Sequence, residues 1–248
     1  MLMEKNKKPK KPDNPNAKHR ERMRARYIKA GLDAMAPHEI LEMLLFYAIP
    51  RKDTNKMAHR ILNEFGSLHN IFESSPQDIV KRCKLTKNTA VLLSMIAPLA
   101  RQYNLSKWNG RTVFTSSKEL GEYAVSLFIG EVTECFYIIC LNNSLSLVAA
   151  ELLEKGTIDR IELYPKEILR RVLYHNASYV VLAHNHPSGS TDISSSDITT
   201  TNHIKKLMLG VEIDVLDHII VCGPDYISLA EKRLLKLAGI EGALANEQ

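Results

Sequence analysis

The sequence contains no cysteine pair spaced as C-x-x-C and no long apolar run. Its four cysteines are scattered along 248 residues, which suits buried thiols in a reducing cytoplasm. No apolar stretch approaches the roughly 20 residues needed to span a bilayer. The amino terminus is charged and lacks the apolar segment of a secretory signal. We therefore expect a cytoplasmic protein without a membrane partner.

The composition is that of an ordinary globular protein, with 45% hydrophobic and 25% charged residues. Such a chain is long enough for one large domain or two modest ones, each with its own core. The net charge of +5 is unevenly placed, because residues 1–29 hold eleven Lys or Arg and three acidic residues. The remaining chain has more acidic than basic residues, so the basicity belongs to the amino-terminal segment.

This basic segment permits two interpretations. Residues 1–17 are rich in Lys, Asn and Pro and have little to bury, which predicts a disordered tail. The basic residues between positions 5 and 29 could neutralise phosphates and bind nucleic acid without sequence preference. The alternative is a solvated tail that aids solubility. No RNP-type aromatic motif, zinc finger or recognition helix strengthens the nucleic-acid interpretation.

Residues 18–104 are predicted to form a small all-α domain. Helices are expected to begin at Pro37, near Asp53, at Ser75-Pro76 and at Thr86, from the apolar spacing and the capping residues. Gly66 is expected to close the second helix, and Pro98 to kink the fourth. Residues 105–111 are polar and are predicted to be a linker.

Residues 112–240 alternate between helical and extended patterns, which predicts an α/β domain with a mixed sheet and flanking helices. The expected elements are a helix capped by Ser117, strands at Cys135–Leu141, Leu145–Ala150 and Thr157–Leu163, a helix at Pro165–His175, a strand at Tyr179–Ala183, a helix at Asp197–Leu209, a strand at Ile213–Cys222 and a helix at Leu229–Leu237. Residues 241–248 are expected to be a loose tail.

The strongest chemical signal follows the apolar run that ends at Ala183. Alternate residues of an extended segment share a face, so His184 and His186 are expected to point the same way. Ser194 suits the N-cap of the next helix, with Asp197 in its first turn. Two imidazoles and one carboxylate suit Zn²⁺ and leave a fourth position for water. The alternatives are satisfied core or surface histidines and an Asp197 that only completes a capping box.

This spacing, His-x-His, seven residues, Ser, two residues, Asp, resembles the motif of the JAMM (MPN+, JAB1-like) metallopeptidases. The segment "VVLAHNHPSGSTDISSSD", together with "DHIIV" from Asp217, resembles the RadC branch of that family. The resemblance covers nearly everything from about Lys18 to Gly239. It implies a cytidine-deaminase-like mixed sheet, one zinc ion held by His184, His186 and Asp197, and hydrolysis of a peptide or isopeptide bond in a protein or peptide substrate.

The resemblance also assigns roles outside the ligand set. Glu134 in "ECFYIIC" matches the glutamate that takes a proton from the water and returns it to the amine. Its rivals are Glu131, Glu151 and Glu154. Ser194 is implied as the donor to the tetrahedral oxyanion. His218 matches a RadC-typical position, for which we expect a supporting or structural role.

The helical domain resembles a helix-hairpin-helix module, yet it departs from that pattern at the turn. The segment from Cys83 to Asn88 contains no glycine, so backbone contacts to DNA phosphates are weakly supported. A structural or partner-docking domain is the favoured interpretation.

Other metal enzymes fit less well. A zinc deaminase requires His-x-Glu and Pro-Cys-x-x-Cys, and the sequence has neither. The histidines of an HNH nuclease are spread over a longer ββα motif. The remaining alternative is a DNA-associated accessory protein of repair or recombination, in which the metal site is structural or vestigial.

Overall fold

The computed structural model describes residues 15–50, 52–108, 113–156, 165–235 and 243. The tail at 1–14, the strand expected at Thr157–Leu163 and most of the tail at 241–248 lie outside these residues. The chain forms two compact units, residues 1–96 and 97–248. No helix within the described residues is long and apolar enough to cross a membrane.

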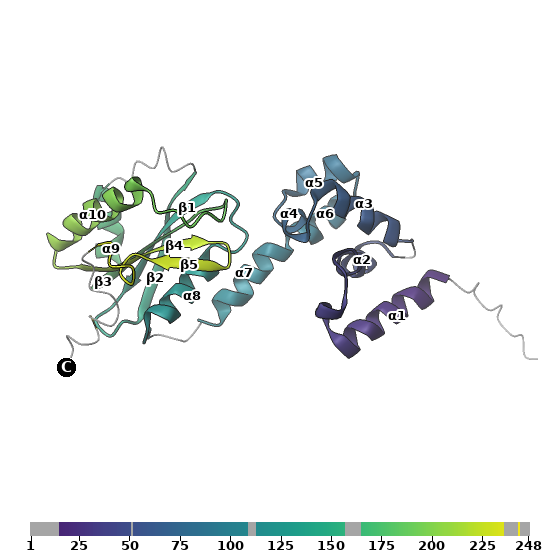
Figure 1. Ribbon diagram of the computed structural model, residues 1–248, viewed down its shortest axis with the longest axis horizontal. Helices are drawn as coiled ribbons and strands as arrows, with labels where there is room; N and C mark the ends of the chain where they lie inside the picture. Colours follow the sequence, from purple (N-terminus) through teal and green to yellow (C-terminus); the bar gives the residue numbers. More distant parts are fainter. Residues whose placement is uncertain (1–14, 51, 109–112, 157–164, 236–242, 244–248) are drawn as a thin grey trace, which may run out of the picture. The chain divides into compact units, whose positions relative to one another are not determined.

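The first unit is helical (Figure 1). Its elements are α1 (Pro15–Ala30), η1 (Leu32–Ala34), α2 (Pro37–Ala48), α3 (Asn55–Phe65), α4 (Leu68–Phe72), α5 (Pro76–Cys83) and α6 (Lys87–Ser94). Leu41 and Leu45 of α2 are fully buried and pack among apolar residues of α3 to α6. The helices expected at Pro37, after Asp53 and at Ser75-Pro76 are confirmed.

Two expectations for this unit are corrected. The disorder predicted through residue 17 is wrong for residues 15–17, because α1 already begins at Pro15. The kink predicted at Pro98 is a break instead, because α6 ends at Ser94 and α7 (Ile96–Ser106) begins as a separate helix. Pro98 has no N–H to donate to the carbonyl of Ser94, so a continuous helix would leave that carbonyl without its partner. Helix α4 was not predicted.

The second unit is built on one mixed five-stranded sheet in the order β2-β1-β3-β4-β5. Its elements after α7 are α8 (Ser117–Leu127), β1 (Glu134–Leu141), β2 (Leu147–Gly156), α9 (Pro165–Tyr174), β3 (Tyr179–Asn185), α10 (Ser195–Leu209), β4 (Asp214–Cys222) and β5 (Asp225–Ser228). Strands β3 and β4 are parallel, and the other neighbours are antiparallel. The α/β fold with a mixed sheet and flanking helices is confirmed.

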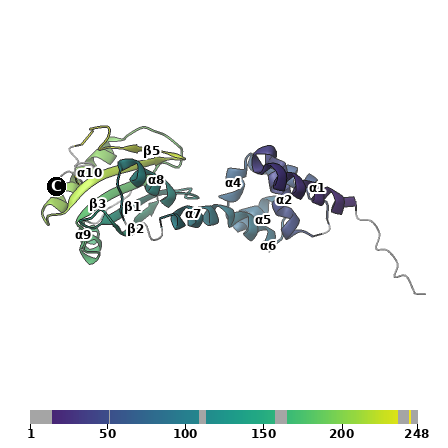
Figure 2. The same ribbon diagram turned by 90° about the horizontal axis from the view of Figure 1, so that it is seen from below.

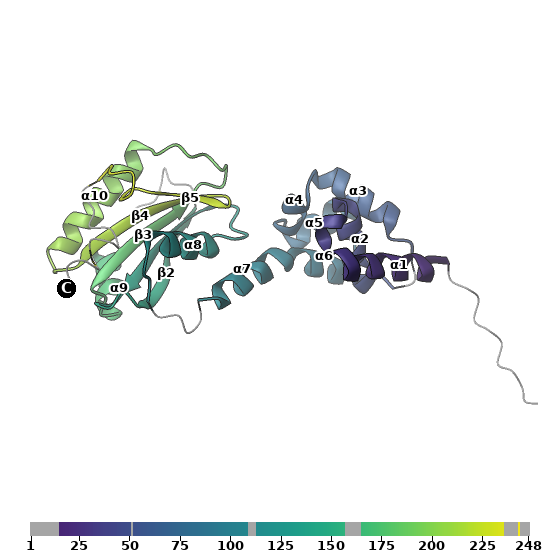
Figure 3. The same cartoon turned by 60° about the horizontal axis from the view of Figure 1, so that its bottom comes forward.

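The two faces of this sheet carry separate apolar layers. Alternation along β1 sends Cys135, Tyr137 and Ile139 toward α8, whereas Phe136 and Ile138 face α9 and α10. Figure 2 shows α8 and α9 against the sheet, and Figure 3 shows α10 running alongside β4. The α10 face is the one on which the predicted ligands gather.

The carboxyl-terminal helix predicted to start at Leu229 is wrong within the described residues, since residues 229–235 form turns. The buried carboxylate of Asp217 accepts hydrogen bonds from the Ser228 hydroxyl at 2.5 Å and from the Ala230 N–H at 3.0 Å. Arg233 has a φ of 55°. These tertiary bonds hold the chain in turns and override its apolar spacing.

Smaller boundary differences also follow from local chemistry. Ser116, not Ser117, caps α8, because its side chain accepts from the Glu119 N–H. Strand β2 starts two residues later than expected, because Leu145 has a φ of 55° and belongs to the turn. The strand then runs six residues beyond the predicted end at Ala150.

Candidate metal centre

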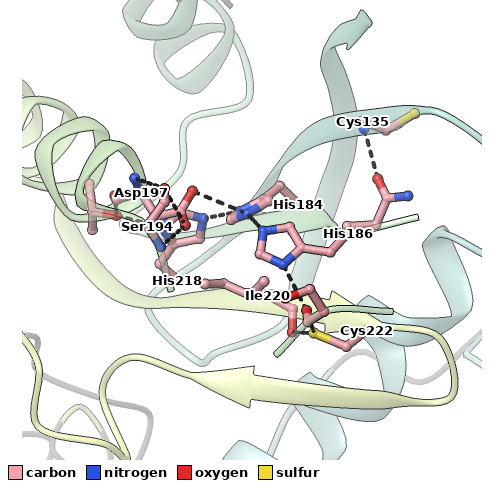
Figure 4. A network of polar contacts seen from close by, with 11 residues as sticks. Cys135, His184, His186, Ser194, Asp197, His218, Ile220 and Cys222 are labelled. Atoms are coloured by element: carbon pink, nitrogen blue, oxygen red, sulfur yellow. Dashed lines mark hydrogen bonds and ion pairs between the residues drawn. The ribbon is translucent and has the colours of Figure 1, made fainter. Parts of the chain in front are cut away.

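The predicted ligands come together where β3 ends and α10 begins. His184 is 1% exposed within β3, and His186 directly follows its last residue. The His186 N–H still donates to the Val221 carbonyl of β4 at 2.8 Å, which extends the strand's direction past its end. Asp197 lies in the first turn of α10 and is 5% exposed. His184, His186 and Asp197 therefore meet where β3 ends and α10 begins, with His184 and Asp197 buried and His186 half-buried (Figure 4).

One ligand atom from each of His184, His186 and Asp197 lies within 4.8 Å of the other two. The Nε2 atoms of the two histidines are 3.0 Å apart, and Nε2 of His184 is 3.3 Å from Oδ1 of Asp197. This compact set of two nitrogens and one oxygen is a cluster capable of holding a metal ion.

Asp197 is both a capping residue and a member of this cluster. Its Oδ2 atom accepts from the Ser194 N–H and the Ser194 hydroxyl, each at 2.8 Å. The Ser194 hydroxyl oxygen in turn accepts from the Asp197 N–H at 3.1 Å, which completes a capping box. The capping box thus turns Oδ2 toward Ser194 and leaves Oδ1 to face His184. The capping-box interpretation of Asp197 is therefore confirmed, and the same carboxylate also lies in the cluster that could hold a metal.

A chain of hydrogen bonds fixes the tautomer of His184. The Thr201 hydroxyl donates to the Asp197 carbonyl at 2.6 Å, so its oxygen accepts from Nδ1–H of His218. Nε2 of His218 is then an acceptor, and Nδ1–H of His184 donates to it at 2.8 Å. His184 consequently presents the lone pair of Nε2 to the cluster.

His186 is oriented in the same sense by the loop that follows it. Its Nδ1–H donates to the Ser190 carbonyl at 2.8 Å, and the Cys222 thiol donates to that carbonyl at 3.0 Å. Nε2 of His186 therefore also points a lone pair at the cluster. Histidine ligands of metals are commonly held through the other ring nitrogen in this way.

Burial keeps the supporting imidazoles neutral. Desolvation lowers the pKa of His184 to about 4, against the opposing attraction of Asp197. Desolvation and the neighbouring histidines also hold the pKa of the fully buried His218 well below its usual range. Neutral imidazole is the form that binds a metal. His184 and His218 are therefore both favoured in the neutral form that metal binding requires of a histidine.

Glu134, the predicted base, is the first residue of β1. It lies two residues before Phe136, which pairs with His184 across β1 and β3. The rings of Phe136 and His184 lie parallel with centroids 6.0 Å apart. Strand alternation places Glu134 on this same face of the sheet, at the end where the histidines lie.

The rival glutamates have other partners or positions. Glu131 accepts from Arg101 at 2.7 Å and from Lys155 at 2.5 Å, and its side chain is 11% exposed. Glu151 pairs with Arg171 at 3.1 Å and with His175. Glu154 is exposed on the edge strand β2 opposite Phe136, one strand farther from the histidines.

Residues 114–234 match the family model of the RadC-like JAB domain. A UPF0758 protein of Fusobacterium nucleatum subsp. nucleatum is 36% identical over 230 residues, which cover 90% of this chain and 99% of the relative. A UPF0758 protein of Pseudoalteromonas translucida is 32% identical over 215 residues, or 87% of this chain and 96% of the relative.

The chain belongs to the RadC-like family. The matched residues of this RadC-like protein include His184, His186 and Asp197. They also include β1, which begins at Glu134, and its neighbours in the sheet, β2 and β3. The resemblance inferred from the His-x-His spacing is thereby confirmed.

Sequence reasoning missed two residues of this RadC-like site. Thr201 lies four residues after Asp197, one helical turn away on the same side of α10, and this spacing was its only signal. Asn185 was passed over because it separates the two histidines and points to the opposite face.

Proposed function

We propose that this RadC-like protein is a zinc-dependent hydrolase of peptide or isopeptide bonds. The observation that carries the proposal is the convergence of three acceptor atoms, from His184, His186 and Asp197, within 4.8 Å of one another. The hydrogen-bond chain through Thr201 and His218 turns the lone pair of His184 Nε2 toward the other two acceptor atoms. A bound cation would balance their mutual repulsion.

The donor set fits zinc. Two neutral imidazole nitrogens and one carboxylate oxygen are ligands that catalytic zinc sites use, and three protein ligands leave a position open. When bound, zinc supplies a Lewis acid that polarises a carbonyl and lowers the pKa of a water.

In the proposed reaction Glu134 moves the protons. Its carboxylate takes a proton from the attacking water and returns it to the leaving nitrogen, since amide cleavage requires both transfers. The position of Glu134 at the start of β1, two residues before Phe136, which pairs with His184, supports Glu134 as the base.

Ser194 is the proposed donor to the oxyanion. Its hydroxyl donates to Asp197 in this structure, so the role requires that hydroxyl to turn away from Asp197.

The proposal is tested by incubating the zinc-loaded protein with a proteome-derived peptide library and identifying the products by mass spectrometry. We expect cleavage by the wild type and a loss of about 100-fold or more in Glu134→Gln, because general acid–base catalysis contributes about 10²–10⁴-fold. Glu154→Gln is the matched control, since it changes a glutamate on the same face of the sheet, and it should retain cleavage. Equal cleavage by Glu134→Gln and the wild type would overturn the assignment of the base.

A further inference from the structure

Asn185 forms a two-point contact with the backbone on either side of Glu134. Its side-chain Oδ1 accepts from the Cys135 N–H at 2.7 Å, a bond drawn at Cys135 in Figure 4. Its Nδ2 donates to the Thr133 carbonyl at 3.1 Å. The Asn185 residue is only 4% exposed, and its bond to Cys135 is buried while its bond to Thr133 is part-buried.

The side chain of Asn185 hydrogen-bonds the backbone next to the last residue pair of β1 and β3, where the pairing of these strands ends. The register between β1 and β3 ends at Phe136 opposite His184, and β3 continues beside β4 to Asn185 opposite Val221. The described β1–β3 register therefore stops two residues short of Glu134. The Asn185 carboxamide provides one donor and one acceptor there, as a peptide group would.

Asn185 lies between the two histidines in the chain, so its contact joins β1 to the segment that carries both of them. His184 and His186 point to one face, and Asn185 points to the other, from the same short segment of chain. On its other side Glu134 pairs with Gly156 of β2, which fixes it relative to the edge strand only. The carboxamide thus connects the backbone of Glu134 directly to the segment that carries both histidines.

We propose that Asn185 is a positioning residue that fixes Glu134 relative to His184 and His186. The proposal rests on the proposed function in one respect, namely that Glu134 acts beside the metal. An error of about 1 Å in a reacting group can cost about 100-fold in rate, and precise sites are held by such supporting hydrogen bonds. An apolar residue of similar size, such as leucine, would fill the same space but make neither bond.

The test uses Co²⁺ in place of zinc, because the visible spectrum of Co²⁺ responds to groups beside it. Glu134→Gln is expected to change the spectrum of the wild type. Asn185→Ala is expected to reproduce that change while it retains about one Co²⁺ per chain. The double variant should show no further change, because the position of a carboxylate that is absent has no effect. A residue that only stabilises the fold would give additive changes instead.

Three spectral outcomes overturn the proposal. These are a wild-type spectrum in Asn185→Ala, additive changes in the double variant, and no change in Glu134→Gln, which would remove Glu134 from the neighbourhood of the metal. If Asn185→Ala does not fold, Asn185→Ser is measured in its place, since it also loses the carboxamide and keeps a polar atom.

Amide hydrogen exchange of the metal-free protein gives a second readout. The N–H of Cys135 should exchange faster in the Asn185 variant, while the N–H of Ile138, in the middle of β1, should remain protected. Unchanged exchange at Cys135 would overturn the proposal as well. Absence of peptide cleavage by the zinc-loaded wild type would overturn the proposed function alone, because neither readout requires a substrate.

Discussion

Two polar networks of the helical unit and the candidate metal cluster of the sheet unit pair their polar groups differently. In the helical unit, the buried carboxylate of Glu42 accepts from Asn55 at 2.9 Å and contacts His19 at 3.0 Å. Arg20 donates to the carbonyl of Phe46, in the last turn of α2, at 3.1 Å and to that of Ile49, directly after the helix, at 2.8 Å. In these two networks each donor meets an acceptor. In the sheet unit, three acceptors from β3 and α10 meet one another.

This difference in hydrogen bonding separates networks that stabilise the fold from a cluster that could bind a metal ion. Buried polar groups that satisfy one another stabilise a fold and require nothing else. Buried acceptors that face one another are stabilised by a bound cation, since an unpaired buried polar group costs free energy. The comparison therefore favours a structural role for the polar network of the helical unit, and it supports the proposed metal binding by the cluster of the sheet unit.

The largest expected effect is loss of metal from the double variant His184→Ala/His186→Ala. We expect elemental analysis to find about one zinc per wild-type chain and none in the variant, because only one of three protein ligands remains. His203→Ala, which changes an exposed histidine of α10, should retain the zinc.

Glu42→Ala tests the other half of that comparison. It should also retain the zinc, while the free energy of unfolding falls by about 1–3 kcal/mol because Asn55 and His19 lose their buried acceptor. A well-folded wild type that takes up no zinc would contradict the binding role, and loss of zinc from Glu42→Ala would contradict the division between the two units.

Much of the fold followed from local signals in the sequence. Gly66 ends α3 with a φ of 83°, as its place after an apolar helical pattern predicted. The expected helix at Leu229 failed because Asp217, eleven or more residues earlier in the chain, binds the hydroxyl of Ser228 and the N–H of Ala230. A pattern of apolar spacing contains no information about such a distant carboxylate.

At the candidate metal site, too, local sequence patterns predict some residues and miss those whose contacts are distant in the chain. The positions of His184, His186 and Asp197 were predictable because strand alternation and helix capping act over a few residues. The contact of Asn185 with Cys135 joins residues 50 positions apart, and that of Thr201 with His218 joins residues 17 apart. These supporting bonds depend on which strands and helices become neighbours, and the motif alone does not specify that.

A smaller effect is expected from Thr201→Val, which sharpens the comparison within the sheet unit. Valine has nearly the shape of threonine but neither donates to the Asp197 carbonyl nor accepts from His218. Loss of such supporting partners typically lowers metal affinity by about 10–100-fold. Competition with a chromogenic chelator measures this change, and Thr199→Val is the control because Thr199 is exposed and donates only to the Ser195 carbonyl. Equal zinc affinities in the two variants would contradict the assigned hydrogen-bond chain.

The smallest expected effect separates two arginines of α1. Arg20 donates to three carbonyls and stacks over the Phe46 ring at 4.7 Å, whereas Arg22 is exposed. Arg20→Ala should lower the free energy of unfolding by about 1–2 kcal/mol in denaturant titrations, and Arg22→Ala should change it by less than about 0.5 kcal/mol. One interpretation of the basic segment is that it binds nucleic acid. In a binding titration, Arg22→Ala should reduce the salt dependence of that binding and Arg20→Ala should not, because the Arg20 guanidinium is already bound to the protein. Equal free energies of unfolding in the two variants would contradict the structural role assigned to the hydrogen bonds of Arg20, because the exposed Arg22 would then contribute as much to stability.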